Sequence, residues 1–329
     1  MNNISINGDP RYINYKFDLY TVPVMAAIIP LFYIVPTIFV LMKIIRVYIQ
    51  SVVGKREETI NRHVFSVIVL QLVMSFFYMS TDYTTIRIPA TGIITAWCAS
   101  VQPNHYIKTL FLLSGYFNYT AMLFPFLLSM LRLIPIYKPI RVEEFCERVV
   151  RISIPLIFLY PLLFCFPLFP ALGDCRQLLG TYQFGAIYFH YRGSWFNIRL
   201  AESLIINSFF WLSGCCVANY LLYKQLKKLQ NSRQSIKIKK AEQSLTFITI
   251  SMFPAYITNL ALLVVFIVSP ESSAYLLALR PYGSDCDFVV VPWVFYLTHP
   301  MFKERPVFQR RDLVPKDVAR RRGMTETTV

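Results

Sequence analysis

Long stretches of this sequence lack charged side chains, and their length is typical of membrane-spanning helices. A bilayer core about 30 Å thick requires ~20 apolar residues in a helix that rises ~1.5 Å per residue. Six charge-free runs reach or approach that length, and a seventh run of 15 residues is marginal. They predict an all-α membrane protein, a seven-transmembrane helix bundle, with spans at Leu19–Met42, Val64–Thr81, Thr109–Leu131, Ile152–Gly173, Ser203–Tyr223, Gln243–Pro270 and Phe288–Phe302.

Acidic residues are scarce, with 18 Asp and Glu against 33 Lys and Arg. Eight of the Lys and Arg lie in the N-terminus and the second, fourth and sixth connections, and 25 lie in the other connections and the tail. Because cytoplasmic segments retain Lys and Arg, we expect the N-terminus outside and the C-terminus in the cytoplasm of a multi-pass plasma-membrane protein. The chain then divides into an extracellular leader, 1–18, a seven-helix transmembrane domain, 19–302, and a basic cytoplasmic tail, 303–329.

Motifs of enzymes and of metal or nucleotide sites are missing. The sequence contains no G-x-x-x-x-G-K-[ST], H-E-x-x-H or G-x-S-x-G, and its four His lack the spacing of a metal site. We therefore expect no enzyme, no cofactor and no metal. The basic residues are spread over four connections without a nucleic-acid-binding module, so anionic membrane lipids are their expected partner and nucleic acid is not.

Two segments between the spans need separate interpretation. Ile88–Ile107 is also charge-free, but it contains Pro and several polar residues, so we expect an extracellular loop, with Trp97 dipping toward the membrane interface. Asp285 and Asp287 precede the short seventh run, and we expect both acids at the extracellular rim. With these boundaries no charged residue lies inside a span, which disfavours an ion-coupled transporter.

Cysteine is used sparingly outside the spans. Three of the seven Cys, namely Cys98, Cys175 and Cys286, fall in predicted extracellular connections, where oxidising conditions favour one disulfide and one remaining thiol. We expect the pair Cys98–Cys175, because it would tie the loop before the third span to the loop after the fourth. Asn3 begins an Asn-Ile-Ser glycosylation acceptor in the predicted extracellular leader.

The predicted spans contain uncharged polar and aromatic side chains instead of charged ones. A mainly apolar pocket with a few polar groups is what a small organic ligand requires. The alternative is that these residues form hydrogen bonds between helices or aromatic belts at the interfaces. The candidate ligand-binding residues are Tyr116, Asn118, Tyr119, Asn207, Trp211, Tyr256, Asn259 and Trp293.

Arg132 follows the third run and lies seven residues before Pro139. Seven helices with an external N-terminus and this Arg–Pro spacing resemble the G-protein-coupled receptor plan. The resemblance implies that Arg132 is a cytoplasmic latch contacted by a G protein, whereas the alternative is one more positive residue that retains its loop in the cytoplasm. The fifth and sixth helices have basic residues at their predicted cytoplasmic ends, and these residues either contact a G protein or retain their loop in the cytoplasm. They are Lys224, Lys227, Lys228, Lys239 and Lys240.

The segment 8–17, GDPRYINYKF, followed by a Pro-containing first span, resembles the nematode serpentine chemoreceptors of the Srg superfamily, most closely class Sru. The sequence departs from the rhodopsin pattern, because Leu131 stands where an acid usually precedes the Arg, and Val291-Pro292 stands where Asn-Pro is expected. The resemblance implies a chemosensory receptor in the ciliated membrane of sensory neurons, with an external small-molecule ligand and a heterotrimeric G protein as partners.

A membrane transporter or channel is the alternative function. An odd number of spans and the lack of an internal repeat disfavour it. The last four residues, which include Thr327 and Val329, fit the [ST]-x-Val pattern of peptides that bind PDZ scaffolds, and the alternative is a disordered end with phosphorylatable threonines.

Overall fold

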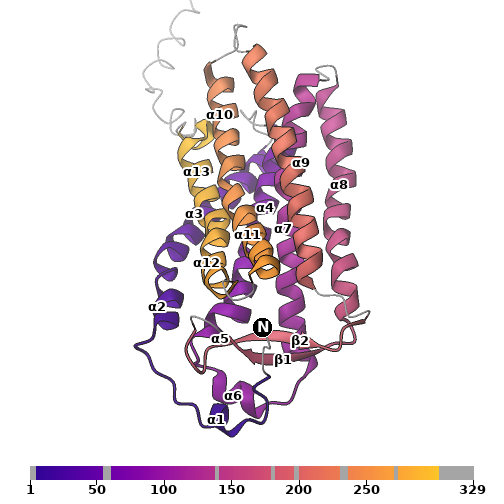
Figure 1. Cartoon of the computed structure of the whole chain (residues 1–329). Helices are drawn as coiled ribbons and strands as arrows, with labels where there is room; N and C mark the ends of the chain where they lie inside the picture. Colours follow the sequence, from indigo (N-terminus) through magenta and orange to yellow (C-terminus); the bar gives the residue numbers. More distant parts are fainter. Residues whose placement is uncertain are drawn as a thin grey trace, which may run out of the picture.

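The computed structural model describes residues 5–54, 61–137, 141–178, 182–195, 200–229, 236–269 and 273–303. Seven long helical rods form one bundle (Figure 1). In chain order they are α2 (Val22–Ile28) with α3 (Leu31–Gly54); α4 (Arg62–Asp82), η1 (Tyr83–Arg87) and α5 (Ile88–Ala90); α7 (His105–Tyr137); α8 (Val142–Cys165) with η2 (Phe166–Leu168); α9 (Leu200–Leu229); α10 (Ile236–Ser251) with α11 (Phe253–Val268); and α12 (Ser273–Asp285), η4 (Cys286–Val290) and α13 (Val291–Thr298).

Prolines account for the interruptions in these rods, because proline lacks the backbone N–H of a helical hydrogen bond. Pro30 separates α2 from α3, and Pro254 is the second residue of α11, which begins directly after the break at Met252. The seventh rod changes from a π-helical turn to α13 just before Pro292. A short α14 (Pro300–Lys303) follows it.

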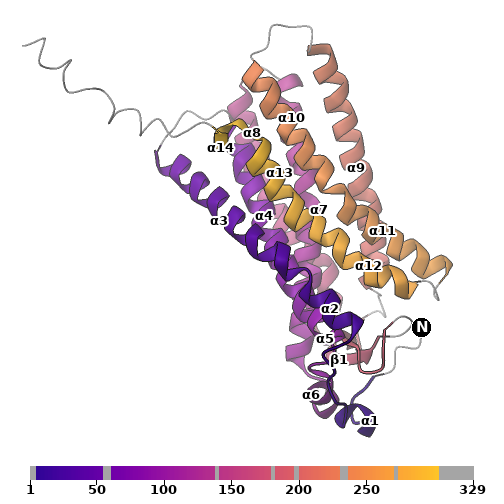
Figure 2. The same cartoon turned by 90° about the vertical axis from the view of Figure 1, so that its left-hand side faces the viewer.

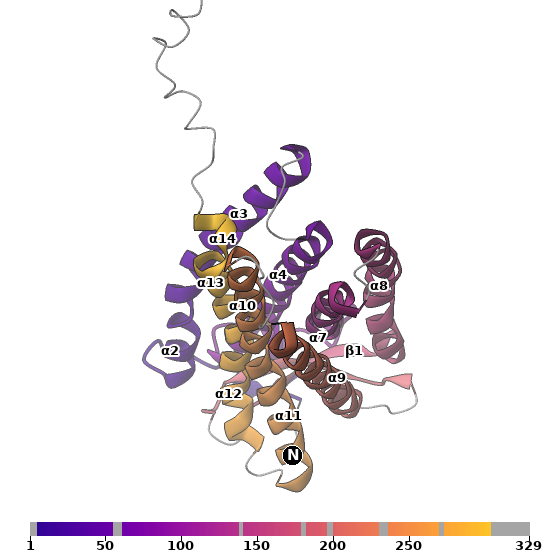
Figure 3. The ribbon, with the colours of Figure 1, turned by 90° about the horizontal axis from the view of Figure 1, so that it is seen from above.

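The third helix, α7, is the centre of the bundle. Among the rods that could span a membrane, its apolar window is 78% buried, whereas that of α8 is only 17% buried. Seen from above, α8 lies at the periphery and α7 lies between α4, α8 and α9 (Figure 3). The apolar side chains that α8 exposes are suited to contact with lipid.

Within the described residues, five rods are long and apolar enough to cross a membrane, by length and composition: Val22–Val53, Arg62–Ala90, His105–Pro135, Val142–Leu168 and Gln243–Leu262. Together with α9 and the α12–α13 rod they make up the seven predicted helices. The predicted fold class, a seven-helix membrane bundle, is confirmed.

A small layer covers one end of the bundle (Figures 1 and 2). It contains an antiparallel pair, β1 (Leu172–Gln177) and β2 (Ile187–Arg192), together with α1 (Pro10–Ile13) and α6 (Thr95–Ser100). Gly173 pairs with Asn104, and a Cβ on this glycine would lie 2.1 Å from the backbone N of Lys108. Glycine therefore lets β1 rest directly on the start of α7.

Cys98 and Cys175 form a disulfide inside this layer, the pair expected from the sequence. Both are buried, and they pack with Ile6, Ile107 and Phe189. The disulfide thus joins α6 to β1 and holds the hairpin over the mouth of the bundle. Trp97, on α6, is 46% exposed. Asn3 lies outside the described residues.

The predicted boundaries of several spans are wrong. The fourth rod begins at Val142 and ends at Leu168, and Gly173, its predicted end, lies in β1. The second rod continues past Thr81 through Asp82 and Arg87, and the seventh begins at Ser273 rather than Phe288. Asp285, expected at the rim, is 4% exposed inside the bundle, and Cys286 lies within the seventh rod rather than in a connection. The rods continue through charged residues because acids and bases from the two rods neutralise one another.

Candidate functional site

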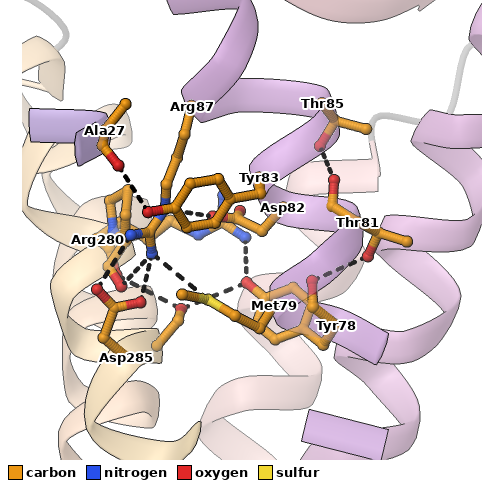
Figure 4. A network of polar contacts seen from close by, with 12 residues as sticks. Ala27, Tyr78, Met79, Thr81, Asp82, Tyr83, Thr85, Arg87, Arg280 and Asp285 are labelled. Atoms are coloured by element: carbon orange, nitrogen blue, oxygen red, sulfur yellow. Dashed lines mark hydrogen bonds and ion pairs between the residues drawn. The ribbon is translucent and has the colours of Figure 1, made fainter. Parts of the chain in front are cut away.

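A buried ion network joins the second and seventh rods (Figure 4). The guanidinium of Arg87 donates to both carboxylate oxygens of Asp285, with Nη1 at 3.0 Å from Oδ2, and its Nε lies 3.4 Å from Oδ2 of Asp82. It also donates to the carbonyl of Pro281 at 2.9 Å and stacks over the ring of Tyr83 at 4.7 Å. All three ionic side chains are at least 94% buried.

A second cation extends the network toward the sixth rod. Arg280 donates from Nε to Oδ1 of Asn259 on α11 and from Nη2 to the hydroxyl of Tyr78 on α4, each at 2.8 Å. The Tyr33 hydroxyl, from the first rod, donates to Asp285. Two Arg balance two Asp, and the four side chains with their hydrogen-bond partners connect the first, second, sixth and seventh rods.

The expectation that no charge lies inside a span is therefore wrong, and with it one reason for disfavouring a transporter. Treating every charged residue as a span boundary hid the network. A signal was present in the sequence: the marginal seventh run is preceded by Arg280 and Asp285, and the second run is followed by Asp82 and Arg87. Each of these two runs is therefore flanked by an acid and a base. Such residues on two neighbouring helices can form an ion network between them.

A small cavity with a mainly apolar lining lies beside the network, between the second, third, sixth and seventh rods. It has room for about one water molecule. Three of the predicted ligand-binding residues line it, namely Asn118, Tyr256 and Asn259. The other polar lining residues are Gln71, Tyr78, Ser284 and Asp287.

The structure places the other five predicted ligand-binding residues in contacts between helices. The hydroxyl of Tyr116 donates to the carbonyl of Phe158, and the ring of Tyr119 stacks on Phe164, both on α8. Trp293 donates to Thr37 on the first rod at 3.0 Å. Asn207 and Trp211, on α9, both bond to the hydroxyl of Tyr160. These contacts agree with the other interpretation of these residues, in which they connect helices instead of lining a ligand pocket.

Arg132 does not end its helix, since α7 continues to Tyr137. The side chain is 3% exposed, and it donates to the hydroxyls of Thr246 at 2.7 Å and Thr249 at 3.3 Å, both on α10. We call these contacts the Arg132 latch. They join α7 to α10, the part of the sixth rod that lies at the end of the bundle away from the hairpin (Figure 1).

The basic residues expected to contact a G protein lie on two helices. Lys224 and Lys227 are exposed on α9. The side chains of Lys228, Lys239 and Lys240 are outside the described part of the structure, as are the tail residues Thr327 and Val329.

The seven rods, the ion network between them and the hairpin over one end define a seven-helix membrane bundle. The solved structure of squid rhodopsin matches it with a TM-score of 0.56 at 14% identity, over 99% of this chain and 98% of that one. At this identity the likeness shows the fold alone.

Sequence comparison gives the family. The model of the serpentine-type 7TM GPCR chemoreceptor family Sru matches residues 6–305. Serpentine receptor class U-26 of Caenorhabditis elegans is 34% identical over 260 residues, which are 78% of this chain and 89% of that protein. The chain belongs to the Sru family of serpentine seven-transmembrane chemoreceptors. The resemblance expected from the sequence is thereby confirmed.

Proposed function

We propose that this protein is a chemosensory receptor that binds an external small molecule and activates a heterotrimeric G protein. The observation that carries the proposal is the arrangement of one bundle with a cavity between four of its rods and the Arg132 latch at α10, toward the end away from the hairpin. Membership of a receptor family and the rhodopsin-like fold support it. The proposed location is the plasma membrane of a sensory cilium, with a PDZ scaffold as an additional partner of the tail.

The ligand would act by selecting one of two arrangements of the bundle. The cavity between the rods holds about one water molecule, so a larger ligand requires the rods to separate at this end. A ligand shifts such an equilibrium only by its difference in affinity for the two states. A tenfold difference supplies about 1.4 kcal/mol.

The signal at the other end would be release of the Arg132 latch. Separation of α10 from α7 breaks the bonds to Thr246 and Thr249 and exposes the guanidinium to a G protein. The exposed Lys224 and Lys227, together with Lys228, Lys239 and Lys240, would supply positive charge around that opening.

The orientation of the chain follows from the uneven distribution of basic residues and gives the first prediction. Epitope tags at residue 2 and residue 329 should be reached by antibodies from opposite sides of intact cells, with the residue 2 tag on the outside. Antibody staining before and after permeabilisation measures this. If both tags are stained on one side, the chain does not cross the membrane an odd number of times.

The second prediction tests receptor function and the latch together. A panel of small molecules is screened with the purified chain in liposomes, and G-protein nucleotide exchange is measured. We expect at least one compound to stimulate exchange. Arg132→Ala should strongly reduce that exchange, because the residue that meets the G protein is gone, while ligand binding and surface level change little.

The same liposomes test the alternative function. Solute flux without any G protein would support a transporter or channel and contradict the receptor proposal. Arg151→Ala is the matched control, since it removes one exposed positive charge on α8, outside the proposed G-protein contacts, and should reduce exchange much less than Arg132→Ala. If Arg132→Ala and the wild type give equal nucleotide exchange, Arg132 does not take part in coupling to the G protein. Its role is then only to retain its loop in the cytoplasm.

A further inference from the structure

The first described residues of the chain, 5–15, cross the layer that covers one end of the bundle. The backbone N–H of Ile6 donates to the carbonyl of Cys175 at 3.1 Å, and that of Gly8 donates to the carbonyl of Ala99 at 2.9 Å. The side chain of Ile6 is fully buried beside the disulfide. We call residues 5–15 the leader strap, and its first half is anchored on β1 and α6.

The leader strap ends in a slot between two glycines. The half-buried ring of Tyr15 lies against Gly92, which follows α5, and against Gly185, which precedes β2. A Cβ at Gly185 would lie 2.1 Å from Cε2 of this ring, and a Cβ at Gly92 would lie 2.9 Å from its hydroxyl oxygen. Both glycines have a positive φ, 90° at Gly185 and 86° at Gly92. Glycine at both positions therefore leaves room for the ring and adopts this backbone without strain.

The leader strap also holds Phe184, the residue before Gly185. The ring of Tyr12 stacks on Phe184 with centroids 4.6 Å apart, and the ring of Tyr15 lies tilted against it at 6.1 Å. Aromatic pairs of this kind stabilise a contact beyond the area that they bury. The turn 182–186 of the hairpin is thus fixed by two rings of the leader strap.

The turn 182–186 packs on the end of the second rod. Ala186 on the turn is buried in one cluster with Leu178 and with Ala90 of α5, and Tyr182 packs against this cluster. Ala90 is only 6% exposed. If the turn moved away from the rod, Ala90 would be uncovered.

A second cavity, which we call the side cavity, borders the same turn. Tyr182 of the turn, Ala90 of the second rod and Pro23 of α2 are among its lining residues, and it has room for only a few water molecules. Residues 16–20 connect Tyr15 to α2, and they are exposed and lie outside helices and strands. Tyr15 is held only by contacts that can open and close, so a shift of the first rod can withdraw its ring from the slot.

We propose that the leader strap closes the side cavity. With the ring of Tyr15 between Gly92 and Gly185, the turn 182–186 stays packed on Ala90, and withdrawal of the ring lets the turn lift and opens the side cavity to solvent. This closure is separate from the disulfide, which joins α6 to β1 and does not reach the turn. It goes beyond the proposed function and does not depend on it.

The experiment measures how fast a water-soluble maleimide labels Ala90→Cys in the purified full-length protein in micelles. The background is Cys286→Ser, which removes the partly buried free thiol of the seventh rod, and the same protein without Ala90→Cys gives the signal of the remaining thiols. We expect labelling with the native leader to be much slower than in protein unfolded by denaturant, because the turn covers the thiol. The labelling rate then follows the population of the open turn.

Three further variants locate the effect. Tyr15→Ala should speed labelling about tenfold, equivalent to about 1.4 kcal/mol. Tyr20→Ala makes the same chemical change at a position of the leader that is 94% exposed, and it should leave the rate unchanged. Phe184→Ala removes a 50% exposed side chain and its stack with Tyr12, and it should speed labelling about threefold or more.

Equal labelling rates of Tyr15→Ala and Tyr20→Ala would overturn the proposal. If Tyr15→Ala does not fold, Phe184→Ala decides, and a rate equal to that of Tyr20→Ala overturns it. Labelling as fast with the native leader as in the unfolded protein would also overturn it, because the turn would then not be closed. Neither a ligand nor a G protein takes part, so this result and that of the nucleotide-exchange assay can fail separately.

Discussion

Arg87→Met is expected to destabilise the protein by about 3–5 kcal/mol, because it leaves the carboxylates of Asp82 and Asp285 buried without their shared cation. Met keeps most of the length of the side chain while removing its charge and all its donors. At roughly 2–4 °C per kcal/mol, the apparent Tm in detergent should fall by about 6 °C or more. The level of the variant at the cell surface should fall with it.

A second substitution and a control make this result specific. Asp285→Asn added to Arg87→Met should recover part of the loss, since one of the two uncompensated charges is removed. Arg151→Met is the matched control: its ion pair with Glu147 on α8 is exposed and should contribute less than about 1 kcal/mol. Equal effects of Arg87→Met and Arg151→Met would show that the network does not stabilise the bundle.

Loss of the disulfide is the other large effect. Cys98→Ser should cost about 2–5 kcal/mol, because the bond closes a loop with a sequence separation of 77 and removes much of the entropy of the unfolded chain. The hairpin of β1 and β2 would lose its tie to α6. Surface expression in cells and the Tm of purified protein measure the effect. Cys175→Ser should match it, since each variant removes the same bond.

Cys286→Ser is the control for cysteine removal. Cys286 is a free, partly buried thiol within the seventh rod, so its substitution should change surface expression much less than that of Cys98. Mass spectrometry of unreduced peptides gives an independent check. A peptide that links Cys286 to either of the other two would contradict the pairing in the structure.

The interior of each span was predictable from the sequence, and its ends were not. Runs without charge, such as Thr109–Leu131, mark the apolar part of a helix correctly, because a backbone inside lipid must satisfy its own hydrogen bonds. Charged residues were then taken as the ends of spans. That rule fails for Arg87 and Asp285, since each is acceptable inside the bundle only when the other is present.

The residues of the candidate site were likewise predictable from the sequence only in part. Asn118, Tyr256 and Asn259 were predicted from their residue types and their expected depth, and they do line one cavity. Asn207 and Trp211 satisfied the same criteria, yet they face Tyr160. Residue type and depth do not specify which neighbour a side chain meets, because that depends on how the rods are rotated against one another.

The sequence by itself determined that the chain forms seven helices, that Cys98 and Cys175 lie outside the apolar spans, and which family the protein belongs to. These properties depend on local hydropathy and on matching residues along the chain. Only the tertiary structure decided that Arg87 pairs with Asp285, that Arg132 bonds to α10 and that Asp287 accepts hydrogen bonds from Ser75 and Gln71. Each of these depends on contact between side chains of separate helices, and burial makes such contacts strong when they are complete and costly when they are not.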